Sequence, residues 1–412
     1  MNFTPVIMGA NRGSYSLARA FYEKYGVKTI IISPFQTGPV RNSRILEFYY
    51  QVDMQDFTAL TCTMAAIQKD YPETQKIIFG SDDRYVELLI KNRTHFSSKW
   101  VVPYSDYESY ISVVDKTNFS NLCEQLDILH PRTVVLRESE TFELAYPVII
   151  KAAQTTEYHN LDFEGKNKVY ICQHEEEAAT IISRIRQAGY TSDLLVQEYI
   201  PGDDTHLGIV TVYVSQKDLQ IKLFSYANVL VDDPTPSAIG NSLAGWVREE
   251  KQVEEPISRM IAATGFYGFA TFDVKYDARR NDYVFFEMNG RLGLSNYYVT
   301  AAGHNVAAYY IEDFLLKKEL SFAPFKKEII YSALTNHLLE HRVEFPKLRT
   351  MPVVHPLVAA YETNWLRKWY IAISKLNFYR KLWKYKSLEG KVKPIETKYT
   401  SFNPKILHTK KL

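Results

Sequence analysis

The stretch Phe266–Gly303 constrains the fold more than any other part of this 412-residue chain. Two apolar runs, residues 269–276 and 283–288, stand on either side of the polar segment 277–282. Apolar runs of this length around a short polar segment predict two strands joined by a turn. We therefore expect an antiparallel hairpin here.

Four polar side chains stand out on this hairpin. Side chains alternate faces along a strand, so Glu287 shares a face with Asn289, and pairing across the turn could bring Asp273 beside Glu287. Arg291 follows two residues later. Carboxylate and amide oxygens suit Mg²⁺ held together with phosphates, and an arginine fork suits a phosphate or carboxylate. The alternative is two edge strands with solvated acids, but an acid in a strongly apolar strand is costly to bury unless it is paired.

Residues 1–110 alternate between short apolar runs and segments with helical spacing. Runs at 5–9, 27–33 and 75–83 have strand character, and the segment 14–25 between the first two has helical spacing and ends before a glycine. Strands alternating with helices predict a parallel sheet and a Rossmann-like α/β domain.

Two loops of this domain follow strands. Gly9–Ser14 lacks the glycine spacing of a dinucleotide-binding loop, which disfavours NAD. Ligands of open α/β sheets nevertheless bind at the carboxyl ends of strands, so Asp82, Asp83 and Arg84 are candidate substrate contacts. A solvated loop is the alternative for these three residues.

Two lysines in the middle of the chain occupy distinctive positions. Lys116 follows Asp115, which can cap a helix, and alone it would be an ordinary surface lysine. Lys151 ends the β-branched run 146–153, a position that indicates an anion at the tip of the strand. The polar segment Gln154–Gly165 predicts a mobile loop.

The runs FDVKYD and VFFEMNGR resemble the metal-binding end of the ATP-grasp carboxylate–amine ligases, whose pattern is Asp, then Glu-x-Asn, then Arg. The resemblance spans roughly residues 110–320 and includes both lysines and a hinge after the strand that begins at Leu194. It implies an α/β fold with a Rossmann-like domain, a two-lobed ATP-grasp domain and a basic, aromatic-rich C-terminal extension. The expected bounds are 1–110, 111–192 for the small lobe, 193–325 for the large lobe, and 326–412.

The resemblance also implies roles for individual residues, with ATP as the nucleotide and Mg²⁺, or Mn²⁺ in its place, as the metal. Lys116 and Lys151 would neutralise phosphates, and Arg291 would stabilise the transferring phosphoryl group. The metal ligands would be Asp273, Glu287 and Asn289. The adenine and ribose would lie at a hinge that comprises Glu198, Tyr199, Ile200, Asp203 and Asp204. The segment Gln154–Gly165 would close as a lid.

Two longer phrases, FFEMNGRLGLSNYYVTAAGHN and GANRGSYSLARAFYEKYGVKTIIIS, look like the D-aspartate ligases of Gram-positive bacteria. Those enzymes attach D-aspartate to the stem-peptide lysine of a peptidoglycan precursor. The resemblance implies an amino-acid substrate and a nucleotide- or lipid-linked precursor as the second substrate. A related enzyme for another amino acid or small carboxylate fits the same motifs.

The C-terminal part of the chain is a separate electrostatic unit. Residues 326–412 hold 18 Lys and Arg against 6 Asp and Glu, whereas the whole chain has a net charge of only +2. Apolar residues recur at helical spacing from Trp365 to Trp383 among basic residues, and no acid occurs between 363 and 388. Such a helix can lie in a membrane interface or face a polyanionic precursor. Alternatively, the aromatic stripe of the helix packs on the core. No nucleic-acid-binding motif is present, so we do not expect nucleic acid as a partner.

Other features limit the function and the compartment. Three widely spaced cysteines indicate neither a disulfide framework nor zinc, and no signal peptide or membrane-spanning run is visible. We therefore expect a cytoplasmic protein with contact at the inner face of the membrane as an option. A carboxylase of the same superfamily lacks support, because there is no biotin-carrier motif. A regulatory protein without catalysis is disfavoured by the retained acids and arginine.

Overall fold

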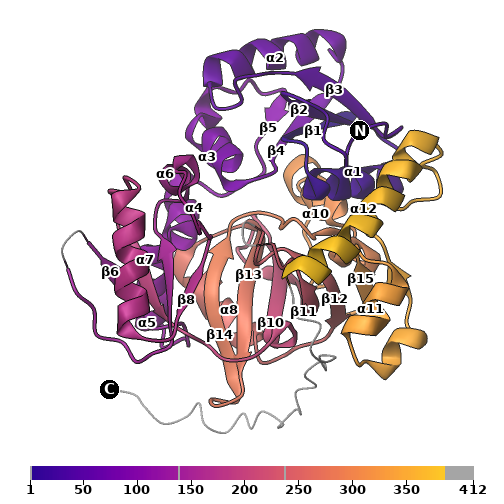
Figure 1. Ribbon diagram of the computed structural model, residues 1–412. Coiled ribbons are helices and arrows are strands. Elements are labelled where there is room, and N and C mark those ends of the chain that lie inside the picture. Colours follow the sequence, from indigo (N-terminus) through magenta and orange to yellow (C-terminus); the bar gives the residue numbers. More distant parts are fainter. Residues whose placement is uncertain (1, 138–139, 236–237, 386–412) are drawn as a thin grey trace, which may run out of the picture.

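The structure is a computed structural model, and it describes residues 2–137, 140–235 and 238–385. Three β-sheets organise the molecule (Figure 1): a five-stranded sheet at the top, a four-stranded sheet at the left and a seven-stranded sheet below. The α/β architecture with both parallel and antiparallel sheets confirms the predicted fold class. None of the helices described is long and apolar enough to cross a bilayer.

The five-stranded sheet is entirely parallel, as the alternating pattern predicts. Its order is β3 (Leu46–Tyr50), β2 (Thr29–Ser33), β1 (Phe3–Met8), β4 (Gln75–Gly80) and β5 (Trp100–Val101). The helices of this region are α1 (Arg12–Tyr25), α2 (Phe57–Asp70) and α3 (Asp83–Lys91). Asn11 and Ser14 cap the start of α1 reciprocally, and Gly26 ends it with a φ of 68°, a conformation that favours glycine.

The four-stranded sheet is antiparallel and follows two helices that connect it to the first domain. Its order is β6 (Thr133–Leu136), β9 (Leu194–Glu198), β7 (Val148–Ala152) and β8 (Tyr170–Cys172). The helices are α4 (Tyr107–Val114), α5 (Lys116–Gln125), α6 (Thr155–Asn160) and α7 (Glu175–Gln187). Its buried side chains form a hydrophobic cluster of their own.

The seven-stranded sheet is antiparallel except for its last pair. Its order is β14 (Asp282–Asn289), β13 (Gly268–Asp277), β10 (Leu207–Val214), β11 (Ile221–Asp232), β12 (Ser242–Arg248), β15 (Ile329–Ser332) and β16 (Val353–Val354). The helices after β12 are α8 (Glu254–Thr264), α9 (Tyr297–Ala301), α10 (Val306–Tyr310), α11 (Asn336–Arg342) and α12 (Trp365–Tyr385).

The sheets place two chain segments differently from the expected domain bounds. β9 was expected to open the large lobe at residue 193, but it pairs with β6 and β7 inside the four-stranded sheet. β15 and β16 were assigned to the extension 326–412, but β15 pairs with β12 and completes the large sheet. Sequence order does not reveal these long-range pairings, because strand neighbours are set by tertiary packing.

One hydrophobic core joins the five-stranded and seven-stranded sheets. Phe21 and Phe79 from the first domain and Tyr213 and Phe269 from the large sheet belong to the same buried cluster. Ring contacts carry the connection, since Phe79 lies 4.7 Å from Tyr310, centroid to centroid. The four-stranded sheet therefore stands apart from a larger body that the other two sheets form together.

Candidate active site

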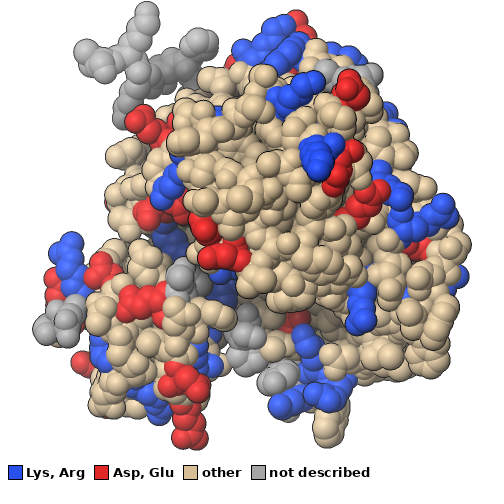
Figure 2. Space-filling model, turned by 90° about the horizontal axis from the view of Figure 1, so that it is seen from above, with Lys and Arg blue, Asp and Glu red and all other residues tan. Residues whose placement is uncertain are grey.

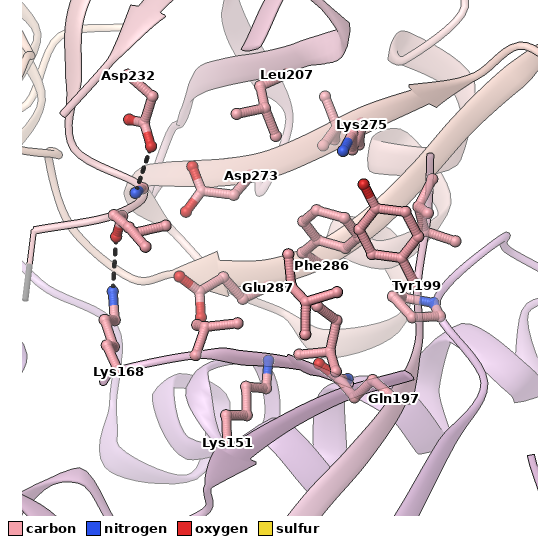
Figure 3. Close-up of a pocket in the computed structure, with 18 of the residues that line it drawn as sticks. Lys151, Lys168, Gln197, Tyr199, Leu207, Asp232, Asp273, Lys275, Phe286 and Glu287 are labelled. Atoms are coloured by element: carbon pink, nitrogen blue, oxygen red, sulfur yellow. Dashed lines mark hydrogen bonds between the residues drawn. The ribbon is translucent and has the colours of Figure 1, made fainter. Parts of the chain in front are cut away.

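A cavity of about 440 Å³ lies between the four-stranded and seven-stranded sheets. Seen from above, a hollow separates the lobe at the lower left from the rest of the molecule, with basic side chains in its depth (Figure 2). Side chains from both sheets line the cavity (Figure 3). Of the predicted site residues it brings together Lys116, Lys151, Glu198, Tyr199, Ile200, Asp203, Asp204, Asp273 and Glu287.

The predicted carboxylate pair forms at the floor of this cavity. Asp273 on β13 lies directly opposite Glu287 on β14 in the antiparallel register, so the predicted hairpin and its pairing are confirmed. Asn289 lies two residues beyond Glu287 on the same strand, opposite Thr271, and is not among the residues that line the cavity.

Burial and mutual repulsion shift the pKa values of the two acids apart. Burial raises the pKa of Asp273 well above its usual value, and the neighbouring Glu287 charge raises it further. Burial also acts to raise the pKa of Glu287, but Lys151 and Lys116 outweigh it, so that the pKa of Glu287 is lowered. Two adjacent carboxylates of this kind tend to share a proton when no metal is bound.

The structure places cationic side chains on the side of the cavity opposite the acids. Lys151 points into the space from β7 (Figure 3), where burial and then Lys116 lower its pKa to about 8. Lys168 approaches from the loop before β8, and its Nζ donates a hydrogen bond to the Ile239 carbonyl at 3.2 Å. The loop of the small lobe that carries Lys168 thus touches the loop after β11 in the large lobe.

The hinge after β9 is braced by a buried lysine. The Nζ of Lys275 donates to the Gly202 carbonyl at 2.8 Å and lies 5.6 Å from the centre of the Tyr199 ring. Burial lowers the pKa of Lys275, although Asp203 and Asp204 act in the opposite direction. This residue fixes the backbone between Tyr199 and Asp204 against β13.

The three acids of the hinge already have intramolecular partners. Glu198 Oε1 accepts a hydrogen bond from Arg280 at 2.7 Å, whereas its Oε2 is buried with no hydrogen-bond partner among the described residues. Asp203 caps a short 3₁₀ turn and accepts a hydrogen bond from the backbone N–H of Thr205 at 2.9 Å. Asp204 accepts one from the backbone N–H of Asp232 at 2.9 Å. Asp203 and Asp204 therefore shape the hinge backbone.

Arg291 lies outside the cavity lining and is held by the N-terminal domain. Its Nε and Nη2 donate to the two carboxylate oxygens of Asp83 at 2.8 and 2.7 Å, a bidentate pair. Among the predicted loop residues, Asp83 thus contacts Arg291, whereas Asp82 caps α3 and pairs with Arg84 at 3.2 Å. The arginine fork that was expected to face a phosphate directly is occupied by a carboxylate.

The segment predicted as a mobile loop contains a helix. α6 covers Thr155–Asn160 within the predicted lid Gln154–Gly165. Tyr158 on this helix is buried, lines the cavity, and donates to the Asn167 carbonyl at 2.7 Å. The polar composition did not predict the helix, because its stability depends on the packing of Tyr158 and not on an apolar stripe.

The donor set fits a magnesium ion. Among the described residues no three His, Cys, Asp or Glu side chains form a metal-binding cluster. Mg²⁺ typically takes one or two carboxylates, and phosphate oxygens and waters complete its shell. Asp273 and Glu287 supply two such carboxylates, and a divalent cation would replace the proton that their proximity requires.

Sequence reasoning missed two lysines of the site, and it treated Asp83 as a candidate substrate contact without foreseeing its contact with Arg291. Lys168 and Lys275 line the cavity, and Asp83 binds Arg291. Lys275 shares a strand face with Asp273, which was a usable signal. Lys168 and Asp83 lie in segments whose contacts are set by the packing of separate sheets, and the sequence carries no signal for those contacts.

The fold is that of ATP-grasp enzymes. The chain resembles N5-carboxyaminoimidazole synthetase from Staphylococcus aureus in complex with ADP (18% identity, TM-score 0.59, 80% of this chain and 82% of that chain). It also resembles phosphoribosylglycinamide synthetase from Anaerococcus prevotii (18%, 0.54, 80% of both) and L-amino acid ligase from Bacillus licheniformis (12%, 0.53, 76% and 74%). At these levels of sequence identity the likeness establishes the fold alone.

A comparison with known sequences identifies the family of the chain. No family model matches the chain. It is 31% identical to the D-aspartate ligase of Enterococcus faecium (strain Aus0004) over 327 residues, which is 77% of each chain. The chain is therefore an ATP-dependent carboxylate–amine ligase. It belongs to the D-aspartate ligase family.

Proposed function

We propose that this ligase joins an amino acid to the side-chain amine of lysine in the stem peptide of a peptidoglycan precursor. D-aspartate is the favoured amino acid. The observation that carries the proposal is the 31% identity to a D-aspartate ligase over 77% of each chain. The precursor would be nucleotide- or lipid-linked. A different amino acid or small carboxylate is the second candidate, because the L-amino acid ligase of B. licheniformis has the same fold.

The reaction requires activation of a carboxylate, since amide formation in water is unfavourable. A carboxylate oxygen of the amino acid attacks the γ-phosphorus of ATP, the bond to the β-phosphate oxygen breaks, and ADP leaves. The amine then attacks the acyl carbon of the acyl phosphate, inorganic phosphate departs, and the amine loses a proton. Catalysis rests mainly on positioning and on neutralising charge.

Residues that line the cavity supply both the positioning and the neutralisation of charge. Lys151 and Lys116 lie where they can neutralise phosphate charge opposite the acids. Asp273 and Glu287, with Asn289 beside them, would hold Mg²⁺, which when bound supplies positive charge next to the transferring phosphoryl group. The adenine and ribose would lie against the hinge 198–204, where Lys275 keeps the backbone in place and the free Oε2 of Glu198 can accept a hydrogen bond.

Arg291 would act from just outside the cavity lining, where it contacts the N-terminal domain. Asp83 holds its planar fork in one orientation. An arginine positioned in this way stabilises negative charge that develops on the acyl phosphate without reorganising during the reaction. We therefore assign Asp83 as a positioning residue for Arg291.

Water has to be excluded while the acyl phosphate exists. α6 and the loop that carries Lys168 come from the small lobe, and the Lys168–Ile239 contact closes that side toward the large lobe. Such a closure protects a reactive intermediate from hydrolysis.

An ADP-release assay with Mg-ATP tests the substrates. The purified chain is offered D-aspartate, L-aspartate and other amino acids, each with and without a lysine-containing muramyl pentapeptide. ADP release that needs both D-aspartate and the pentapeptide, with a product heavier by one aspartyl residue, is the expected result. Release with another pair would retain the ligase mechanism and reject D-aspartate. Tight ATP binding without release for any pair would favour a regulatory protein.

A further inference from the structure

Five large apolar side chains on one face of α12 are exposed to solvent. The exposed fractions are 65% for Trp365, 62% for Trp369, 54% for Ile373, 66% for Leu376 and 74% for Trp383. At 3.6 residues per turn these positions fall in one stripe along the helix. We call this stripe the α12 face. The possibility that the aromatic stripe packs on the core is therefore wrong for these five residues.

The opposite face of α12 is firmly attached to the protein. Arg367 is buried, donates to the Pro39 carbonyl at 2.8 Å, and lies 4.0 Å over the ring of Tyr15. Ile371 and Leu382 are buried in the hydrophobic clusters below. Figure 1 shows α12 crossing from the N-terminal domain to the seven-stranded sheet. Because the inner face is anchored at both ends, the α12 face is fixed outward.

Positive charge borders the α12 face. Lys368 and Arg380 are exposed, and the helix Trp365–Tyr385 contains no acidic residue. Two other basic residues are engaged inward: Arg367 is buried, and Lys381 pairs with Asp233 at 3.2 Å. An exposed helix with tryptophans on one face and lysines or arginines along it matches the pattern of helices that lie in membrane interfaces.

We propose that the α12 face binds the surface of an anionic phospholipid bilayer. Its tryptophan rings would lie at the head-group level, and Lys368 and Arg380 would contact lipid phosphates. A second copy of the chain fits less well. In a symmetric dimer through this face, α12 would pack against α12 of the partner and bring basic residues together, and the helix has no acid to pair with them. This inference goes beyond the proposed ligase reaction and does not rest on it.

Vesicle flotation with the full chain tests the proposal. The variant W365S/W369S/W383S removes the three rings, and V52S/F322S, at two exposed apolar positions outside the α12 face, is the matched control. We expect binding to phosphatidylglycerol-containing vesicles, weaker binding to pure phosphatidylcholine, and weakening by salt. The triple variant should lose about tenfold or more in vesicle affinity, whereas the control should bind like the original chain.

Tryptophan fluorescence gives a second readout. The chain has five tryptophans, and the two outside α12, Trp100 and Trp246, are only 8% and 3% exposed. A blue shift on anionic vesicles, and quenching by brominated lipids, would therefore report on the α12 face.

Three outcomes would overturn the proposal. The first is the absence of binding to anionic vesicles, and the second is equal binding by the triple variant. The third is a dimer in solution that the triple variant converts to a monomer, which would assign the face to a second copy. ADP release with soluble substrates should be equal in all variants, so failure of the membrane proposal is distinguishable from failure of the ligase proposal.

Discussion

Two carboxylates side by side in a cavity are an unfavourable arrangement for a protein without a bound cation. The raised pKa of Asp273 and the lowered pKa of Glu287 reflect the repulsion between the two buried carboxylates and the attraction of Glu287 to the nearby lysines. The lysines opposite the pair offset part of the negative charge but do not contact Asp273 in place of a metal. At the residue scale, the site is therefore arranged for a ligand of high positive charge density together with phosphates.

The substitution Glu287→Gln separates the function of this acid from its contribution to folding. It removes one negative ligand and also the repulsion from Asp273, so thermal stability should be equal or higher. ATP turnover should fall about 100-fold or more, because a metal ligand contributes several kcal/mol to charge stabilisation. Thermal unfolding and ADP release measure the two effects. Turnover at the original rate would remove Glu287 from the metal site.

Arg291 and Asp83 should behave as one unit. Arg291→Lys replaces a bidentate fork by a point charge, and Asp83→Asn removes the charge that orients the fork. We expect each substitution to lower kcat about tenfold, with little change in KM for ATP, and we expect the double variant to be no worse than Arg291→Lys alone. Multiplicative losses in the double variant would show that Asp83 acts independently of the arginine.

We expect Lys151 to give the enzyme a specific pH dependence. Its pKa of about 8 means that the charge is present below that pH and is lost as the pH rises through it. The KM for ATP should therefore increase above about pH 8. In Lys151→Arg this increase should disappear, since a guanidinium does not deprotonate in that range. An unchanged alkaline limb in the arginine variant would assign it to another group.

The hairpin was predictable at the level of elements because its signals are local. Strand alternation and the polar turn bring Asp273 close to Glu287, but a register shift between Asp273 and Val274 puts the two acids directly opposite each other, and the sequence carries no signal for that shift. α6 was not predictable, since it is short and polar and depends on the buried Tyr158. The contact of Asp83 with Arg291 joins residues 208 positions apart, and a single sequence carries no signal for such a contact.

The hinge depends on a contact between elements that the sequence did not reveal. Lys275→Met keeps the length of the side chain but removes the hydrogen bond from Nζ to the Gly202 carbonyl. A charged hydrogen bond of this kind contributes about 1.5–3 kcal/mol, so KM for ATP should rise about tenfold or more while the fold is retained. Nucleotide titration measures the effect. Unaltered ATP binding would mean that the hinge holds its shape without the lysine.

At the scale of the whole molecule, two sheets share one core and the third has a core of its own. A lobe with a separate core can move against the larger body at little cost in buried contacts. The cavity lies at this junction, and closure of the four-stranded lobe would bring Lys151 and Lys168 toward the acids of the larger body. The hollow in Figure 2 lies along the same junction.

The central claim is that the chain forms an amide through an acyl phosphate, and oxygen transfer tests it most directly. D-aspartate labelled with ¹⁸O in its carboxyl groups is supplied with Mg-ATP and the pentapeptide, and the released inorganic phosphate is analysed by mass spectrometry. The account predicts one ¹⁸O in each inorganic phosphate formed, because the attacking carboxylate oxygen stays on phosphorus when the amine displaces it. Unlabelled phosphate, or label in AMP, would contradict the acyl-phosphate mechanism.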